Sequence, residues 1–132
     1  MVISGIVILI ALISDLFGTF WTFDELIRTE YKNYKSEWNK DHMPRGFFWQ
    51  PPELRLLPWK GIKEYIRANK LMYKSVLARD WLSLSWMFST PRWMLGDAGA
   101  KNLIYRLRIL TAIWDIGILS TFLFLIRRYL TF

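Results

Sequence analysis

The sequence predicts an all-α membrane protein in which two transmembrane helices form a hairpin around a basic, partly helical and amphipathic segment. Two observations predict this class. The chain of 132 residues is 53% hydrophobic and 17% aromatic, and its apolar residues are concentrated at its two ends. All but two of its Lys and Arg residues lie in the middle, within residues 24–108. This length predicts one domain. The alternative is a soluble helical protein that buries its two apolar helices in a core.

The first element is an apolar stretch over residues 2–23. It contains no basic residue and one acid, Asp15, and its length matches the roughly 20 residues that cross a hydrocarbon core. A secretory signal peptide would begin with basic residues and place small residues before a cleavage point. Here there is no basic start, and the bulky run LFGTFW follows the apolar core. We therefore expect a retained transmembrane helix.

The second transmembrane helix is expected over residues 109–128, after the run RLR, with Arg127 and Arg128 at its end. Cations near the span ends are more numerous on the side of the middle segment, and such an excess marks the cytoplasmic side. We therefore expect a multi-pass protein of the prokaryotic plasma (inner) membrane, with residues 24–108 as a cytoplasmic loop. The alternative is the mitochondrial inner membrane.

The loop begins with a charged stem, FDELIRTEYKNYKSEWNK, which predicts a helical continuation of the first span. Asp24 and Arg28 are spaced i, i+4 in it and are expected to pair. The stretch MPRGFFWQPPELRLLPW then combines prolines with aromatic residues, which predicts an irregular segment along a surface. Its aromatic residues are expected to act as interfacial anchors. These anchors are Phe47, Phe48, Trp49 and Trp59.

From residue 60 to residue 88, apolar residues recur at spacings of three and four, which predicts an amphipathic helix. Its first half carries a basic face made of Lys60, Lys63, Arg67, Lys70 and Lys74. Such a helix is typical of binding to anionic lipid head groups. Docking on a partner subunit and packing within the chain's own core fit the pattern too. We exclude nucleic acid, because there is no recognition motif and membrane topology already accounts for the positive loop.

No residue pattern in the chain predicts catalysis. The chain has no cysteine, and its one histidine, His42, lies in a polar stretch. A Ser/His/Asp set, a CxxC pair, a GxGxxG loop and a P-loop are all missing from the sequence. We therefore expect a protein that is not an enzyme and has no metal site and no cofactor.

Two carboxylates interrupt the apolar stretches. Asp15 lies about 12 Å and Asp115 about 9 Å from the loop end of its span, from the rise of an α-helix. A charged Asp at the centre of a bilayer costs at least about 2.5 kcal/mol, so each needs a partner. The two acids could share a proton with each other, or each could contact another chain. We favour an assembly contact over a proton relay, because no further ionisable residues cross the spans.

Several short motifs resemble the universal stress protein B type of two-pass bacterial membrane protein. They are GFF at Gly46–Phe48, the pair Tyr65 and Ile66 in the amphipathic segment, and RLRILTA from Arg106 to Ala112. The resemblance implies an N-terminal span, a basic cytoplasmic middle, a second span and a stress-associated role. It implies no catalytic residue.

These observations lead to one expected function and two alternatives. We expect a small non-catalytic membrane protein that serves as an accessory or assembly subunit of a larger membrane complex, for instance of the respiratory or photosynthetic type. The first alternative is a free-standing stress-response or lipid-binding protein that acts through its basic helix. The second is a proton-coupled transport component that uses Asp15 and Asp115.

Overall fold

Every regular element is helical in the computed structural model, which describes residues 2–55 and 61–130. The elements are α1 (Val2–Asn33), α2 (Lys35–Lys40), the short 3-10 helix η1 (Pro52–Leu54), α3 (Ile62–Phe88), α4 (Arg92–Leu95) and α5 (Ala98–Leu130). Two of them, α1 and α5, are long and apolar enough to cross a membrane. The predicted all-helical class and its two long apolar helices are therefore confirmed.

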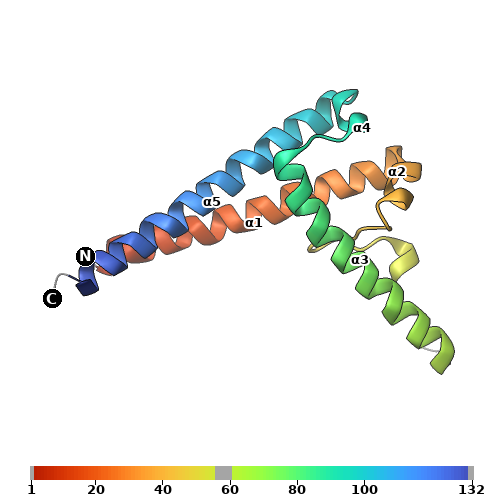
Figure 1. Cartoon of the computed structure of the whole chain (residues 1–132), viewed down its shortest axis with the longest axis horizontal. Helices are drawn as coiled ribbons and strands as arrows, with labels where there is room; N and C mark the ends of the chain where they lie inside the picture. Colours follow the sequence, from red (N-terminus) through yellow and green to blue (C-terminus); the bar gives the residue numbers. More distant parts are fainter. Residues whose placement is uncertain (1, 56–60, 131–132) are drawn as a thin grey trace.

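Helices α1 and α5 lie side by side and antiparallel, with both chain termini at one end of this α1–α5 pair (Figure 1). Two glycines allow the close approach. A Cβ on Gly18 would lie 3.6 Å from the Leu110 side chain, and a Cβ on Gly117 would overlap the end of Leu12. Small residues at such positions let helix backbones approach one another. Leu12 is therefore level with Gly117, and Gly18 is level with Leu110.

The hydrophobic core lies at the loop end of the α1–α5 pair. It is formed by Phe23, Leu26, Ile27, Leu82, Trp86, Met94, Ala100, Ile104 and Leu107. The apolar residues nearer the termini are mostly exposed, for example Ile10 and Phe122, each more than half exposed. The chain therefore covers its own apolar surface at the loop end and leaves the terminal parts of both long helices uncovered.

Helix α3 crosses the α1–α5 pair steeply instead of running along it (Figure 1). One face of α3 is buried, through Ser75, Ala78, Leu82 and Trp86. Arg108 of α5 fastens the C-terminal end of α3. Its Nε donates to the Trp86 carbonyl at 2.9 Å, and its Nη2 donates to the Thr90 hydroxyl at 2.9 Å. The last carbonyls of a helix lack partners within the helix, so this bond satisfies one of them.

The N-terminus of α5 is capped by Asp97, whose Oδ1 accepts the backbone N–H of Ala100 at 3.0 Å. This bond from Ala100 holds the pKa of Asp97 below its usual value, because it favours the charged carboxylate. The Tyr34 hydroxyl, just beyond α1, donates to the other carboxylate oxygen at 3.1 Å. The end of α1 and the start of α5 are thereby joined at the loop end of the pair.

Candidate functional site

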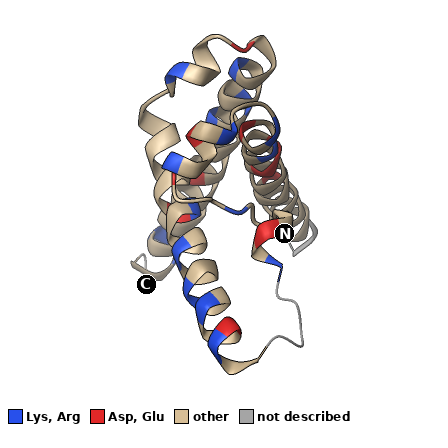
Figure 2. Ribbon diagram, turned by 90° about the vertical axis from the view of Figure 1, so that its right-hand side faces the viewer, with Lys and Arg blue, Asp and Glu red and all other residues tan. Residues whose placement is uncertain are grey.

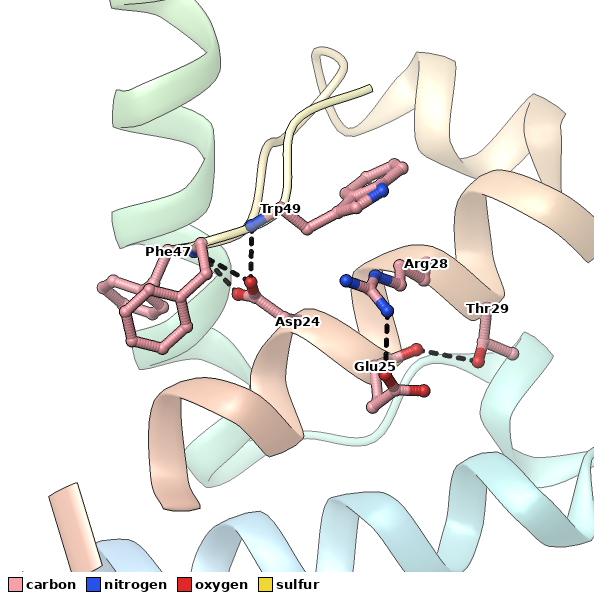
Figure 3. A network of polar contacts seen from close by, with 7 residues as sticks. Asp24, Glu25, Arg28, Thr29, Phe47 and Trp49 are labelled. Atoms are coloured by element: carbon pink, nitrogen blue, oxygen red, sulfur yellow. Dashed lines mark hydrogen bonds and ion pairs between the residues drawn. The ribbon is translucent and has the colours of Figure 1, made fainter. Parts of the chain in front are cut away.

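A buried carboxylate, Asp24, fixes the Gly46–Trp49 segment against α1 (Figure 3). Asp24 is 2% exposed. Its oxygens accept the backbone N–H groups of Phe47 at 2.6 Å, Phe48 at 2.8 Å and Trp49 at 2.7 Å. Hydrogen bonds to an ionised acceptor are stronger than those between neutral groups. One side chain therefore satisfies three successive donors of an irregular segment at the edge of the apolar part of α1.

Gly46 is required by this arrangement, because a Cβ there would overlap the Asp24 carboxylate. Gly46→Ala is expected to lower the free energy of unfolding by about 1–3 kcal/mol, the usual cost of overpacking. Thermal unfolding in detergent, followed by tryptophan fluorescence, measures the change. Gly5→Ala is the control, since nothing lies within 4 Å of a Cβ at Gly5. Equal melting temperatures for the two variants would contradict the overlap.

The aromatic residues that were predicted as anchors differ in their surroundings. Phe47 stacks on Phe20 of α1, with ring centroids 4.0 Å apart, and is half-buried. Trp49 is half-buried as well and packs edge-on against Tyr31. Among the three described anchors, only Phe48 is exposed, at 50%. Trp59 lies outside the described residues. All three described anchors therefore pack on aromatic residues of the chain, because Phe48 stacks on Phe17 with ring centroids 4.8 Å apart. Phe48 differs in that half of its surface stays exposed to its surroundings.

The predicted Asp24–Arg28 pair is wrong. Because Asp24 is engaged by the Gly46–Trp49 segment, Arg28 turns to the neighbouring acid, and its Nη1 lies 3.2 Å from Oε1 of Glu25 (Figure 3). The Arg28 guanidinium also lies over the exposed Trp21 ring, 5.9 Å from its centroid.

A second buried carboxylate, Glu30, lies further along α1 and is 0% exposed. Neither of its oxygens makes a hydrogen bond within the described part of the chain, and the nearby Trp93 indole N–H also lacks a partner there. Burial, followed by the neighbouring Asp41 carboxylate, raises the pKa of Glu30 to about 9. Both effects disfavour the charged form. Glu30 therefore holds its proton at neutral pH.

A cleft of about 1220 Å³ opens between α2, α3 and residues 89–93. Tyr34, Trp81, Trp86 and Trp93 give it an aromatic lining. Its charged lining residues include Lys40, Asp41, Lys74 and Arg92. We call this cavity the aromatic cleft.

The two acids of the apolar stretches lie in the same part of the α1–α5 pair, between the two glycine contacts, but they do not meet. Asp15 is half-buried, and its Oδ2 is enclosed without a hydrogen-bond partner among the described residues. Asp115 is exposed on α5. No hydrogen bond joins the two side chains over residues 2–55 and 61–130. Within the described part of the chain, Asp15 and Asp115 are therefore not partners of each other.

The predicted basic face of α3 is exposed along its described length. Its four described members, which we call the basic row, are Lys63, Arg67, Lys70 and Lys74. None of the four makes an ion pair or hydrogen bond with another described residue. Lys60 lies outside the described residues. The basic row ends in the aromatic cleft, which Lys74 lines.

No metal site is evident among the described residues, because no three His, Cys, Asp or Glu side chains cluster there. His42 is exposed on the rim of the aromatic cleft. It occupies a left-handed turn, with φ of 64°, and is followed by Met43 with φ of 55°.

Comparisons with protein-family models, with curated proteins and with solved structures found no significant match for this chain. The class that the structure defines is an all-helical chain with two helices able to cross a membrane.

Proposed function

We propose that the chain is a two-pass membrane protein that serves as a non-catalytic accessory or assembly subunit of a larger membrane complex, of the respiratory or photosynthetic type. The lengths of α1 and α5 support the two spans. Helix α1 is about 48 Å long by its 32 residues, against a hydrocarbon core of about 30 Å. Residues 2–23 of α1 supply the apolar part, and its charged remainder extends into water.

Asp115 is the observation that carries the proposal. It is exposed in the middle of an apolar stretch of α5 and has no partner in the described part of the chain. A carboxylate that faced lipid there would cost at least about 2.5 kcal/mol, so such residues face other helices or water-filled cavities. A helix of another subunit that offers a hydrogen bond to Asp115 would remove this cost.

The charge distribution supports the expected orientation. Lys101, Arg106 and Arg108 lie at the loop end of α5, and the positive-inside rule places such a loop in the cytoplasm. We therefore propose the prokaryotic plasma membrane as the location, or the mitochondrial inner membrane with the loop in the matrix.

Purification of the tagged protein in a mild detergent tests the proposal. The wild-type chain is expected to carry stoichiometric companion subunits. With Asp115→Leu, the amount of companion subunits recovered is expected to fall at least tenfold, because the substitution removes the hydrogen-bonding group. Asp115→Asn keeps a hydrogen-bonding amide and is expected to retain most of the companion subunits.

Ser120→Leu is the matched control, because it removes another exposed polar group from the same helix. It is expected to leave the companions in place. Recovery of the wild-type chain alone, or as a homo-oligomer with anionic lipid, would overturn the subunit proposal and support the free-standing lipid-binding alternative.

A further inference from the structure

The aromatic cleft presents apolar side chains that the chain itself leaves uncovered. Trp81 is 72% exposed and Leu77 is 50% exposed, and both line the cleft. Tyr34 and Trp93, which also line it, pack against each other in a tilted arrangement, with ring centroids 4.8 Å apart. Concave surfaces rich in Trp and Tyr are typical of binding sites for partner proteins.

Two of the three Lys and Arg residues that line the cleft have no ion-pair partner in the described part of the chain. Lys74 and Arg92 line it and make no ion pair with any described residue, whereas Lys40 is bound to Glu37 at 3.0 Å. The basic row continues from Lys74 along α3 at spacings of four and three residues, which keeps its members on one face of a helix. The cleft and the basic row therefore form one continuous surface with an apolar wall and unpaired positive charge.

This surface extends beyond the lipid head groups. Trp86, at the base of the cleft, packs on Phe23, where the apolar part of α1 ends, with ring centroids 5.3 Å apart. Tyr34 directly follows the end of α1, eleven residues after Phe23, which corresponds to about 16 Å along the direction of the helix. The head-group layer adds only about 5–8 Å to each side of the hydrocarbon core. A view from the loop end of the pair shows Lys and Arg residues along α3 (Figure 2).

We propose that the aromatic cleft and the basic row together bind an acidic, amphipathic segment of a partner protein on the aqueous side of the membrane. Apolar side chains of that segment pack on Trp81 and Leu77, and its carboxylates pair with Lys70, Lys74 and Arg92. Amphipathic helices bind hydrophobic grooves in this way, and complementary charge selects the partner. This inference rests on the proposed function, since it names the surface that a companion subunit would contact.

A labelled peptide tests the proposal with the full chain in nanodiscs of phosphatidylcholine. The probe is an 18-residue helix of Glu and Leu in amphipathic order, and a second peptide carries Gln in place of Glu. Fluorescence anisotropy is expected to report binding of the acidic peptide, at least tenfold tighter than binding of the Gln peptide. Because exposed ion pairs are screened by salt, affinity falls as the salt concentration rises.

Variants locate the binding surface. Lys70→Glu/Lys74→Glu and, separately, Trp81→Ala are expected to weaken binding of the acidic peptide at least tenfold. All three residues are exposed, so the fold is retained. Lys101→Glu/Arg106→Glu, which reverses two exposed charges on α5, is the matched control and is expected to change the affinity less than twofold.

Three results of the peptide and vesicle experiments would overturn the inference. The first is that the wild-type chain does not bind the acidic peptide, and the second is that Lys70→Glu/Lys74→Glu and Trp81→Ala bind it as tightly as the wild-type chain does. The third is that the wild-type chain binds phosphatidylserine vesicles, that Lys70→Glu/Lys74→Glu abolishes this binding, and that the acidic peptide does not compete with the vesicles. If companion subunits still copurify with Lys70→Glu/Lys74→Glu and with Trp81→Ala, the inference about the binding surface is overturned and the proposed function stands. A wild-type chain that binds the acidic peptide but purifies without companions overturns the proposed function alone.

Discussion

Asp24→Ala is expected to lower the free energy of unfolding by about 3–5 kcal/mol. The substitution leaves the N–H groups of Phe47, Phe48 and Trp49 without their acceptor, and each buried donor left unpaired costs about 1–3 kcal/mol. The expected loss of stability is smaller than three times the largest cost of an unpaired donor, because water can hydrogen-bond to part of the segment once Asp24 no longer holds it. Thermal unfolding in detergent measures the loss of stability.

Hydrogen exchange gives the residue-level measurement for the same change. The amides of Phe47, Phe48 and Trp49 are expected to be protected in the wild-type chain and to exchange rapidly in Asp24→Ala, with an intermediate effect in Asp24→Asn, whose amide has one acceptor oxygen. Glu25→Gln is the control, because Glu25 is partly exposed and its carboxylate binds no described residue other than Arg28. Protection that persists in Asp24→Ala would show that the segment is held by its aromatic contacts instead.

Periodicity and composition were sufficient to predict the long helices. Apolar runs over residues 2–23 and 109–128, each with one acid inside it, predict helices of spanning length, and α1 and α5 contain them. The helices extend well beyond the apolar runs, since α1 continues to Asn33 and α5 begins at Ala98. For α5 the reason is local: Asp97 is an N-cap residue, and a capped helix begins where its cap lies rather than where hydrophobicity begins.

The partners of the charged residues could not be predicted, because they come from distant parts of the chain. Spacing along α1 favoured an Asp24–Arg28 pair, whereas 23 residues separate Asp24 from Phe47, its first backbone donor. The nearest available signal was the Gly46-containing GFF run, since a glycine suits a close approach of backbone to another group. Glu30 was missed in the same way, because its neighbours include Asp41, just after α2, and Trp93 of α4.

The relation between Asp15 and Asp115 illustrates the difference between depth and direction. Counting residues placed both acids at similar depth, and the contacts of Gly18 and Gly117 lie on either side of them in the pair. A helix turns by 100° at each residue, so similar depth does not put two side chains on facing surfaces. Asp115 is exposed and Asp15 is half-buried, and the direction of each depends on how α1 and α5 pack.

Glu30→Gln is expected to remove most of the pH dependence of stability between pH 4.5 and pH 9. The pKa of Glu30 is about 9 in the folded chain, against 4.5 for the ordinary side chain. The folded state therefore binds a proton that the unfolded state has lost over this range, and stability falls as pH rises. The stabilisation is fully present below pH 4.5 and is lost as pH rises through about 9. At pH 8 the loss amounts to about 4–5 kcal/mol for one such group.

Melting temperatures of the wild-type chain and Glu30→Gln, measured from pH 5 to pH 9 in one detergent, test this expectation. The two curves should approach each other at pH 5, where Glu30 is neutral, and separate at pH 8, where the glutamine variant melts higher. Asp41→Asn should flatten the wild-type curve in part, because it removes the carboxylate that helps to raise the pKa of Glu30. Glu64→Gln changes an exposed acid of α3 and should leave the slope intact. If the Glu30→Gln variant kept the wild-type slope, the proton would have to be bound elsewhere, and the buried Glu30 carboxyl would be charged at neutral pH.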